Sequence, residues 1–175
     1  NFHTLFNILN TIILFPFASP VISLANHIVK SKPEVDDAAR LLYLDERILE
    51  TPAIAMVQLK KEILRFSEKV EENMELALES FYDVNEDKML KAVSEEKVIN
   101  YLCGEITDYI MKVQRLDAIS RDEQSELFQM HELMVDLERV GDHAENIAEY
   151  GLSRIETTVD FSIDAIYELK MMSDK

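Results

Sequence analysis

The sequence predicts an all-α protein, an antiparallel three-helix bundle preceded by a hydrophobic helical segment. Only 3 glycines and 4 prolines occur among the 175 residues, which favours long helices with few turns over a sheet-rich fold. Three long stretches carry apolar side chains at steps of three and four residues, the period of an α-helix. Short polar turns separate these stretches, so consecutive helices should pack side by side in opposite directions.

Residues 1–29 form the first element, and they contain no Asp, Glu, Lys or Arg. The segment is longer than the about 20 residues that cross a bilayer core, so we expect a transmembrane helix. Its polar residues include His3, Asn7 and Asn10, which share one helical face and should point into a helix bundle or an aqueous cavity rather than toward lipid. A buried amphipathic helix pair of a soluble protein is the alternative.

Residues 30–51 are interpreted as a connector that leads from this segment to the bundle. Lys30, Lys32 and Arg40 follow the apolar segment directly, which indicates that the chain after about residue 30 is cytoplasmic. Thr51 is a favourable N-cap and Pro52 a favourable first helical residue, so the first long helix should span 52–83.

The second long helix is predicted over 86–117, and its apolar stripe is interrupted by Glu96. A carboxylate in such a stripe is costly unless it is paired, hydrogen-bonded or bound to a metal. Asn100 follows one turn later on the same side. The alternative is that Glu96 lies at the edge of the stripe and bends out to solvent.

The third helix should run from about 120 to 156, because Ser120 and Glu123 have the spacing of a capping box. The bundle would then occupy 52–157. After it, residues 158–175 are predicted to begin a further helix, with Asp160 as its N-cap, and so to start another structural unit.

A row of carboxylates occupies one face of the third helix, beside its apolar stripe: Glu138, Asp142, Glu145 and Glu149. Like charges at this spacing repel one another, so the row suggests a metal ion or basic side chains nearby; a solvated acidic face is the alternative. If the second and third helices pack together, Glu96 and Asn100 would face Glu138 and Asp142. These oxygen donors suit hard divalent cations or ferric iron.

Composition excludes several other classes of function. The 34 acidic and 18 basic residues give a net charge of −16, which repels nucleic acid. Cys103 is the single cysteine, and a packed core thiol is its simplest role. No phosphate-binding loop or nucleophile arrangement is present, and the helices lack the Glu-x-x-His pairs of di-metal carboxylate enzymes. We therefore expect that the chain is not an enzyme.

The stretch LERVGDHAENIAE, together with EEKVINYLCGEI upstream, resembles the signature motifs of the PhoU family, the helical regulators of phosphate uptake. The resemblance implies that Glu96, Asn100, Glu138 and Asp142 line a metal-binding surface, with divalent or ferric ions as cofactors. Glu145 and Glu149 would then be ordinary surface residues.

The segments HTLFNILNTIILFPF and LDERILETPAIA resemble the last membrane segment and connector of bacterial sodium/phosphate cotransporters. The resemblance implies the C-terminal part of a sodium-dependent phosphate transporter of the plasma membrane, with a cytoplasmic PhoU-like regulatory domain and a second, truncated repeat from residue 158. Its implied partners are the membrane, sodium and inorganic phosphate through membrane repeats that this chain lacks, with no nucleic acid; a homo-oligomer fits the same picture. A freestanding PhoU-type adaptor is the alternative.

Overall fold

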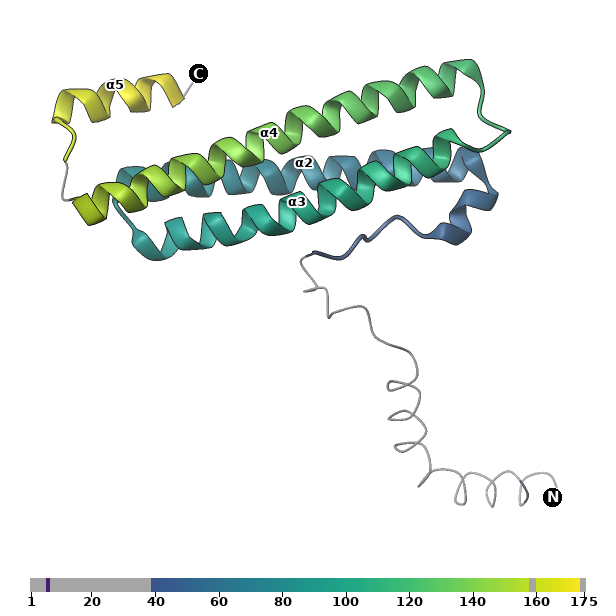
Figure 1. Ribbon diagram of the computed structural model, residues 1–175, viewed down its shortest axis with the longest axis horizontal. Helices are drawn as coiled ribbons and strands as arrows, with labels where there is room; N and C mark the ends of the chain where they lie inside the picture. The colour runs from purple at the N-terminus through teal and green to yellow at the C-terminus, as the bar shows by residue number, and fades with distance from the viewer. Residues whose placement is uncertain (1–5, 7–38, 158–159, 174–175) are drawn as a thin grey trace. The chain divides into compact units, whose positions relative to one another are not determined.

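The computed structural model describes residue 6, residues 39–157 and residues 160–173. Figure 1 shows three long helices lying side by side, with the middle helix of the chain running opposite to the other two. No strand occurs in this described part of the chain, so the predicted all-α class and antiparallel three-helix bundle are confirmed. The elements are η2 (Glu46–Glu50), α2 (Pro52–Asp83), α3 (Glu86–Gln114), α4 (Arg121–Thr157) and α5 (Ile163–Ser173).

Helices α2 and α4 start where their capping residues predicted. Before α2, the carbonyl of Thr51 accepts the N–H groups of Ile54 and Ala55 at 2.9 and 3.0 Å, although the predicted cap from the Thr51 side chain is absent. Before α4, the Ser120 N–H donates to Glu123 Oε2 at 2.9 Å, and the Glu123 N–H donates to Ser120 Oγ at 3.3 Å. The capping box therefore forms as the sequence predicted.

Two helix boundaries differ from the prediction. Helix α3 ends at Gln114 rather than 117, because Arg115 and Leu116 turn back onto the carbonyls of Lys112 and Val113. Helix α5 begins at Ile163, and the hydroxyl of Ser162 caps it by accepting the Ala165 N–H at 3.2 Å. The predicted cap at Asp160 is therefore wrong, since the carboxylate of Asp160 instead pairs with Arg154 at 3.1 Å.

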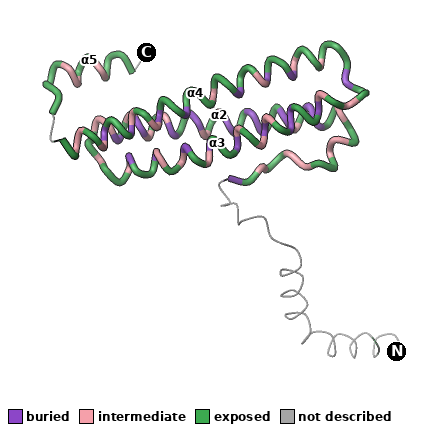
Figure 2. The backbone as a smooth tube through the Cα atoms, in the orientation of Figure 1, coloured by how far each residue is buried: buried purple, intermediate pink, exposed green. Residues whose placement is uncertain are grey.

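The core of the bundle consists of two apolar clusters, and Figure 2 shows the buried positions facing inward along all three long helices. The larger cluster is centred on fully buried Phe66, Ile106 and Leu127. The smaller one is built mainly from alanines, with Met89 as its largest side chain. Apart from Ile119, the buried residues of both clusters lie in α2, α3 and α4, so most of the buried apolar surface comes from these helices.

The predicted connector is docked onto the bundle over residues 39–51. Glu62 of α2 is fully buried, and its Oε2 accepts the N–H groups of Leu42 and Tyr43 at 2.9 and 2.7 Å. Arg65 binds Glu62 Oε1 through Nε at 2.7 Å, and its Nη2 also donates to the carbonyl of Arg40 at 3.2 Å. These contacts fix the connector to α2.

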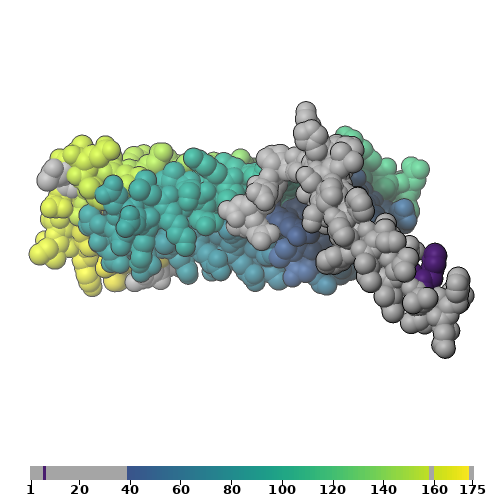
Figure 3. All heavy atoms as spheres, turned by 90° about the horizontal axis from the view of Figure 1, so that it is seen from below, coloured from purple at the N-terminus to yellow at the C-terminus, as the bar shows by residue number. Residues whose placement is uncertain are grey.

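The predicted membrane segment, residues 1–29, lies outside the described residues except for Phe6. Among the residues that the structure describes, no helix is both long enough and apolar enough to cross a bilayer. Within the bundle unit, Figure 3 shows α3 in teal beside α2, and α5 in yellow at one end.

Candidate metal site

A polar level crosses the middle of the bundle and separates its two apolar clusters. On α2, Asn73 stands between Val70 of the larger cluster and Ala77 of the smaller one. Glu96 occupies the equivalent place on α3, and Gly141 occupies it on α4. The amide of Asn73 donates to the carbonyl of Ala92 at 3.2 Å, which ties α2 to α3 at this level.

Gly141 allows α3 and α4 to approach each other beside the acidic residues. A Cβ atom at this position would stand 3.1 Å from Cγ2 of Ile99, closer than ordinary van der Waals contact. The absence of a side chain at Gly141 therefore lets the two helices come close. As a result, the carboxylates on either side of Gly141 lie near α3.

Glu96 is the most unusual side chain at this level. It is only 3% exposed, and its Oε1 has no hydrogen-bond partner. Burial is the main cause that raises the pKa of Glu96 above its ordinary value of 4.5; the charges of Glu145, Asp142 and Glu138 raise it further, whereas a hydrogen bond from Asn100 lowers it. The structure therefore places Glu96 inside the stripe and not at a solvated edge.

The four residues predicted as metal ligands differ in their exposure. Glu96 is buried, whereas Asn100, Glu138 and Asp142 are exposed. All three exposed groups act on the pKa of Glu96, so they lie within electrostatic reach of its carboxyl group.

The position of Glu145 differs from the prediction. It was expected to be ordinary surface, but it is half-buried and, of the three charges, raises the pKa of Glu96 most. Its position one turn after Asp142 on the same stripe was the available signal. Arg139, by contrast, is directed to Asp136 at 3.5 Å.

The donor set matches a hard cation in its chemistry, because carboxylate and amide oxygens are the ligands that such ions prefer. The partnerless Oε1 of Glu96 is the observation that favours such a group. As the side chains stand, no group of three or more acidic, histidine or cysteine residues in the described ranges is close enough together to hold an ion. An ion would therefore require the exposed carboxylates to rotate toward Glu96.

Comparisons with known proteins find one matching family model and several similar curated proteins. The family model described as "PhoU domain" matches residues 63–151, which include Glu96 and the α4 carboxylates. Over 99% of its length the chain is 24% identical to proteins of Escherichia coli K12 and Salmonella typhimurium, each named "Putative inorganic phosphate export protein YjbB". The chain spans 32% of the length of these relatives. No solved structure matches it.

Proposed function

The chain belongs to the PhoU domain family, and from this premise we propose that it is the C-terminal part of a membrane transporter of inorganic phosphate. In this proposal the bundle is a cytoplasmic domain that regulates the transporter, and residues 1–29 are a segment in the plasma membrane. The observation that carries the proposal is the alignment of almost the whole chain with relatives named for phosphate export. The charge-free segment joined to the PhoU domain supports it.

We also propose that this phosphate transport depends on sodium. It rests on the resemblance of residues 1–29 and the connector to sodium/phosphate cotransporters, whereas the aligned relatives are named for export. A freestanding PhoU-type adaptor is the second candidate. Such an adaptor has no need for a charge-free apolar segment of 29 residues at its start, which favours the transporter.

Transport of radiolabelled phosphate tests this function directly. The reading frame that contains this chain would be expressed in cells that lack their own phosphate transporters, and phosphate movement would be followed with either sodium or potassium outside. We expect phosphate movement above the empty-vector control and a larger rate with sodium. Equal rates in both cation solutions would reject sodium coupling alone, while no movement in either would reject the transporter.

We further propose that Glu96, Asn100, Glu138 and Asp142 bind a divalent or ferric metal ion, with Glu145 as an additional ligand. The support is the buried, partnerless oxygen of Glu96 beside three other carboxylates. A cation there would stabilise charges that otherwise repel one another. It would also hold α3 against α4 at the level of Gly141.

Elemental analysis of the purified chain tests the metal proposal. The variant Glu138→Ala/Asp142→Ala should contain much less metal than the wild type. Glu132→Ala/Glu149→Ala is the matched control, because it also removes two exposed carboxylates from α4 and should leave the metal content unchanged. Equal metal content in all three proteins would remove the proposed site.

A further inference from the structure

Residues 39–51 of the connector lie on the surface of the bundle, and we call this segment the strap. No residue of η2 is buried, and Leu42 and Tyr43 are 60% and 40% exposed. Four apolar side chains of the strap are partly buried against the larger cluster, and they are Leu41, Leu44, Ile48 and Leu49. The strap therefore covers the core of the bundle and contributes little to its fully buried part.

The first half of the strap is held by one buried carboxylate of α2. Glu62 Oε2 accepts the N–H of Leu42 at 2.9 Å and the N–H of Tyr43 at 2.7 Å. Arg65 donates through Nε to Glu62 Oε1 at 2.7 Å and through Nη2 to the carbonyl of Arg40 at 3.2 Å. Two neighbouring side chains of α2 thus hold the backbone of residues 40–43.

The second half of the strap is held by two side chains of α3. Tyr109 is buried, and its hydroxyl donates to the carbonyl of Asp45 at 3.2 Å. Lys112 pairs with Glu46 at 2.8 Å, and both of these side chains are exposed. Because an exposed ion pair adds little stability, the hydroxyl of Tyr109 is the main polar anchor of this half.

Detachment of the strap would leave no buried charge without its partner. Glu62 would keep Arg65, which lies three residues later on the same helix. Asp45 would keep Arg47, since both residues belong to the strap and pair within it. This differs from an ordinary buried ion pair between two elements, in which separation of the elements leaves each charge unpaired.

The hydrogen bonds that shape the second half of the strap are also internal to it. The side chain of Asp45 accepts the N–H of Arg47 at 2.9 Å. The carbonyl of Asp45 accepts the N–H of Ile48 at 3.1 Å, and the carbonyl of Ile48 accepts the N–H of Thr51 at 3.0 Å. None of these bonds has to break when the strap leaves the bundle.

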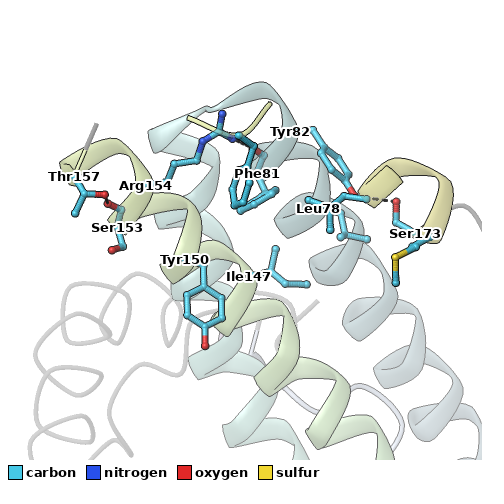
Figure 4. A pocket seen from close by; sticks show the side chains of 12 residues that line it. Leu78, Phe81, Tyr82, Ile147, Tyr150, Ser153, Arg154, Thr157 and Ser173 are labelled. Carbon is cyan, nitrogen blue, oxygen red and sulfur yellow. Dashed lines mark hydrogen bonds between the residues drawn. The ribbon is translucent and has the colours of Figure 1, made fainter. Parts of the chain in front are cut away.

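The attachment of α5 shows what a weaker contact with the bundle looks like. In Figure 4 the hydroxyls of Tyr82 and Ser173 are hydrogen-bonded at 3.0 Å, in an exposed contact. No residue of α5 is buried, whereas the strap binds Glu62, which is fully buried. Local opening is rarer where the contacts are more buried. The strap should therefore open less often than α5 and more often than the core.

We propose that the strap detaches from the bundle as one unit while α2, α3 and α4 stay folded. In the attached state Glu62 and Tyr109 hold its two halves. In the detached state the chain before residue 39 is joined to α2 through a free linker. This conformational step goes beyond the proposed transport function and does not depend on it.

Hydrogen exchange of backbone amides, followed by NMR on the full chain in neutral detergent, tests the proposal. The amides of Leu42 and Tyr43 report on the strap, and those of Ile106 and Leu127 report on the core. The strap amides should exchange at least about tenfold faster than the core amides and at least about tenfold slower than amides of an unfolded peptide. Low concentrations of urea should speed exchange of the core amides more, because opening the strap exposes less surface.

Two single variants separate the strap from the core. Ile99→Val shortens a fully buried side chain ten residues before Tyr109 and should speed exchange of the core amides by about fivefold. It should leave the strap amides unchanged, because it destabilises the attached and detached states equally. Tyr109→Phe removes the anchor of the second half, and it should speed exchange of the strap amides, which lie in the first half, by about fivefold. Tyr101→Phe is the matched control, since it removes an exposed hydroxyl from the same helix and should change neither set.

Four results would overturn the proposal. Equal rates and equal urea dependence for the two sets of amides would mean that the strap opens only when the bundle unfolds. Strap amides that exchange as fast as those of an unfolded peptide would mean that the strap is not attached in solution. An equal effect of Ile99→Val on both sets would show that the bundle opens together with the strap. Strap amides that Tyr109→Phe leaves unchanged would show that the two halves open separately.

Discussion

Two buried carboxylates in the same bundle, Glu62 and Glu96, have opposite surroundings. Glu62 is fully buried, and its oxygens receive two connector N–H groups and the guanidinium of Arg65. Glu96 is 3% exposed, with one oxygen that lacks a partner and three other carboxylates nearby. Burial alone therefore does not decide whether the chain compensates the charge of a carboxylate.

The difference lies in what compensates the lost hydration of each charge. For Glu62 the chain itself supplies every hydrogen bond, so this residue joins the connector to the bundle. For Glu96 the chain supplies a hydrogen bond from Asn100 but also further negative charge, so a proton or a cation would relieve the remaining repulsion. The charge of Glu62 is thus compensated by the chain itself, whereas Glu96 keeps one oxygen without a hydrogen-bond partner.

Glu62→Ala should cause the largest loss of stability. The substitution leaves the N–H groups of Leu42 and Tyr43 and the guanidinium of Arg65 without their acceptor, and removing one partner of a buried pair costs about 3 kcal/mol or more. Urea unfolding of the full chain measures this free energy. Glu68→Ala, an exposed change on the same helix, should cost less than about 0.5 kcal/mol. Similar losses for both variants would show that the connector contacts contribute little.

Glu96→Gln should raise the free energy of unfolding of the metal-free protein at neutral pH. The pKa of Glu96 is raised in the folded state above its ordinary value of 4.5. Below pH 4.5 the carboxyl group is protonated in both states and does not lower stability. As the pH rises from 4.5 through the raised pKa, the wild type loses stability. Glutamine does not ionise, and the variant should therefore be more stable than the wild type at pH 7.

Urea unfolding at several pH values, with a chelator present, measures the stability difference between Glu96→Gln and the wild type. The difference should vanish near pH 4 and grow toward pH 7. A difference that stays constant with pH would mean that Glu96 is not the group that titrates, and the contrast with Glu62 would then lose its electrostatic basis.

Local sequence signals predicted the fold and, of the two buried carboxylates, Glu96. The helical period and the capping residues Thr51, Pro52 and Ser120 gave accurate starts for two helices, and the interruption of an apolar stripe identified Glu96. Both kinds of signal act within one or two helical turns. Such signals are the ones that a single sequence contains.

Long-range contacts could not be predicted in this way. Glu62 accepts hydrogen bonds from backbone N–H groups 19 and 20 residues earlier in the chain. No sequence pattern within α2 predicts these hydrogen bonds. The effect of Glu145 on Glu96 depends on how α4 is rotated against α3 around Gly141, which packing decides. The sequence motif selected Glu138 and Asp142 on this face of α4 but not Glu145.

Alanine at two glycines tests whether the level of Glu96 is closely packed. An added Cβ at Gly104 meets nothing within 4 Å, so Gly104→Ala should stabilise α3 by about 0.5–1 kcal/mol through helix propensity. The same change at Gly141 places Cβ 3.1 Å from buried, β-branched Ile99, which cannot rotate freely. We expect that contact to cancel the gain. Equal stabilisation in thermal unfolding would indicate that α3 and α4 are less closely packed there.

A third carboxylate, Asp45, has its charge compensated by Arg47 without being buried. Removing that partner should therefore have the smallest effect on stability. The side chain of Arg47 donates to Asp45 at 3.0 and 2.6 Å, and the backbone N–H of Arg47 donates to Asp45 at 2.9 Å. The side-chain hydrogen bond is the main cause that lowers the pKa of Asp45 to about 2.

Arg47→Ala should return the pKa of Asp45 toward 3.8, as a carboxyl-carbon NMR titration would show. Because the depressed pKa favours the folded state only above the unfolded value, this contribution fades as the pH falls from 3.8 toward 2. Solvent screens such an exposed pair, so Arg47→Ala should leave the unfolding midpoint at pH 7 almost unchanged. A large shift of that midpoint would show that exposed contacts, and not the buried pair at Glu62, hold the connector on the bundle.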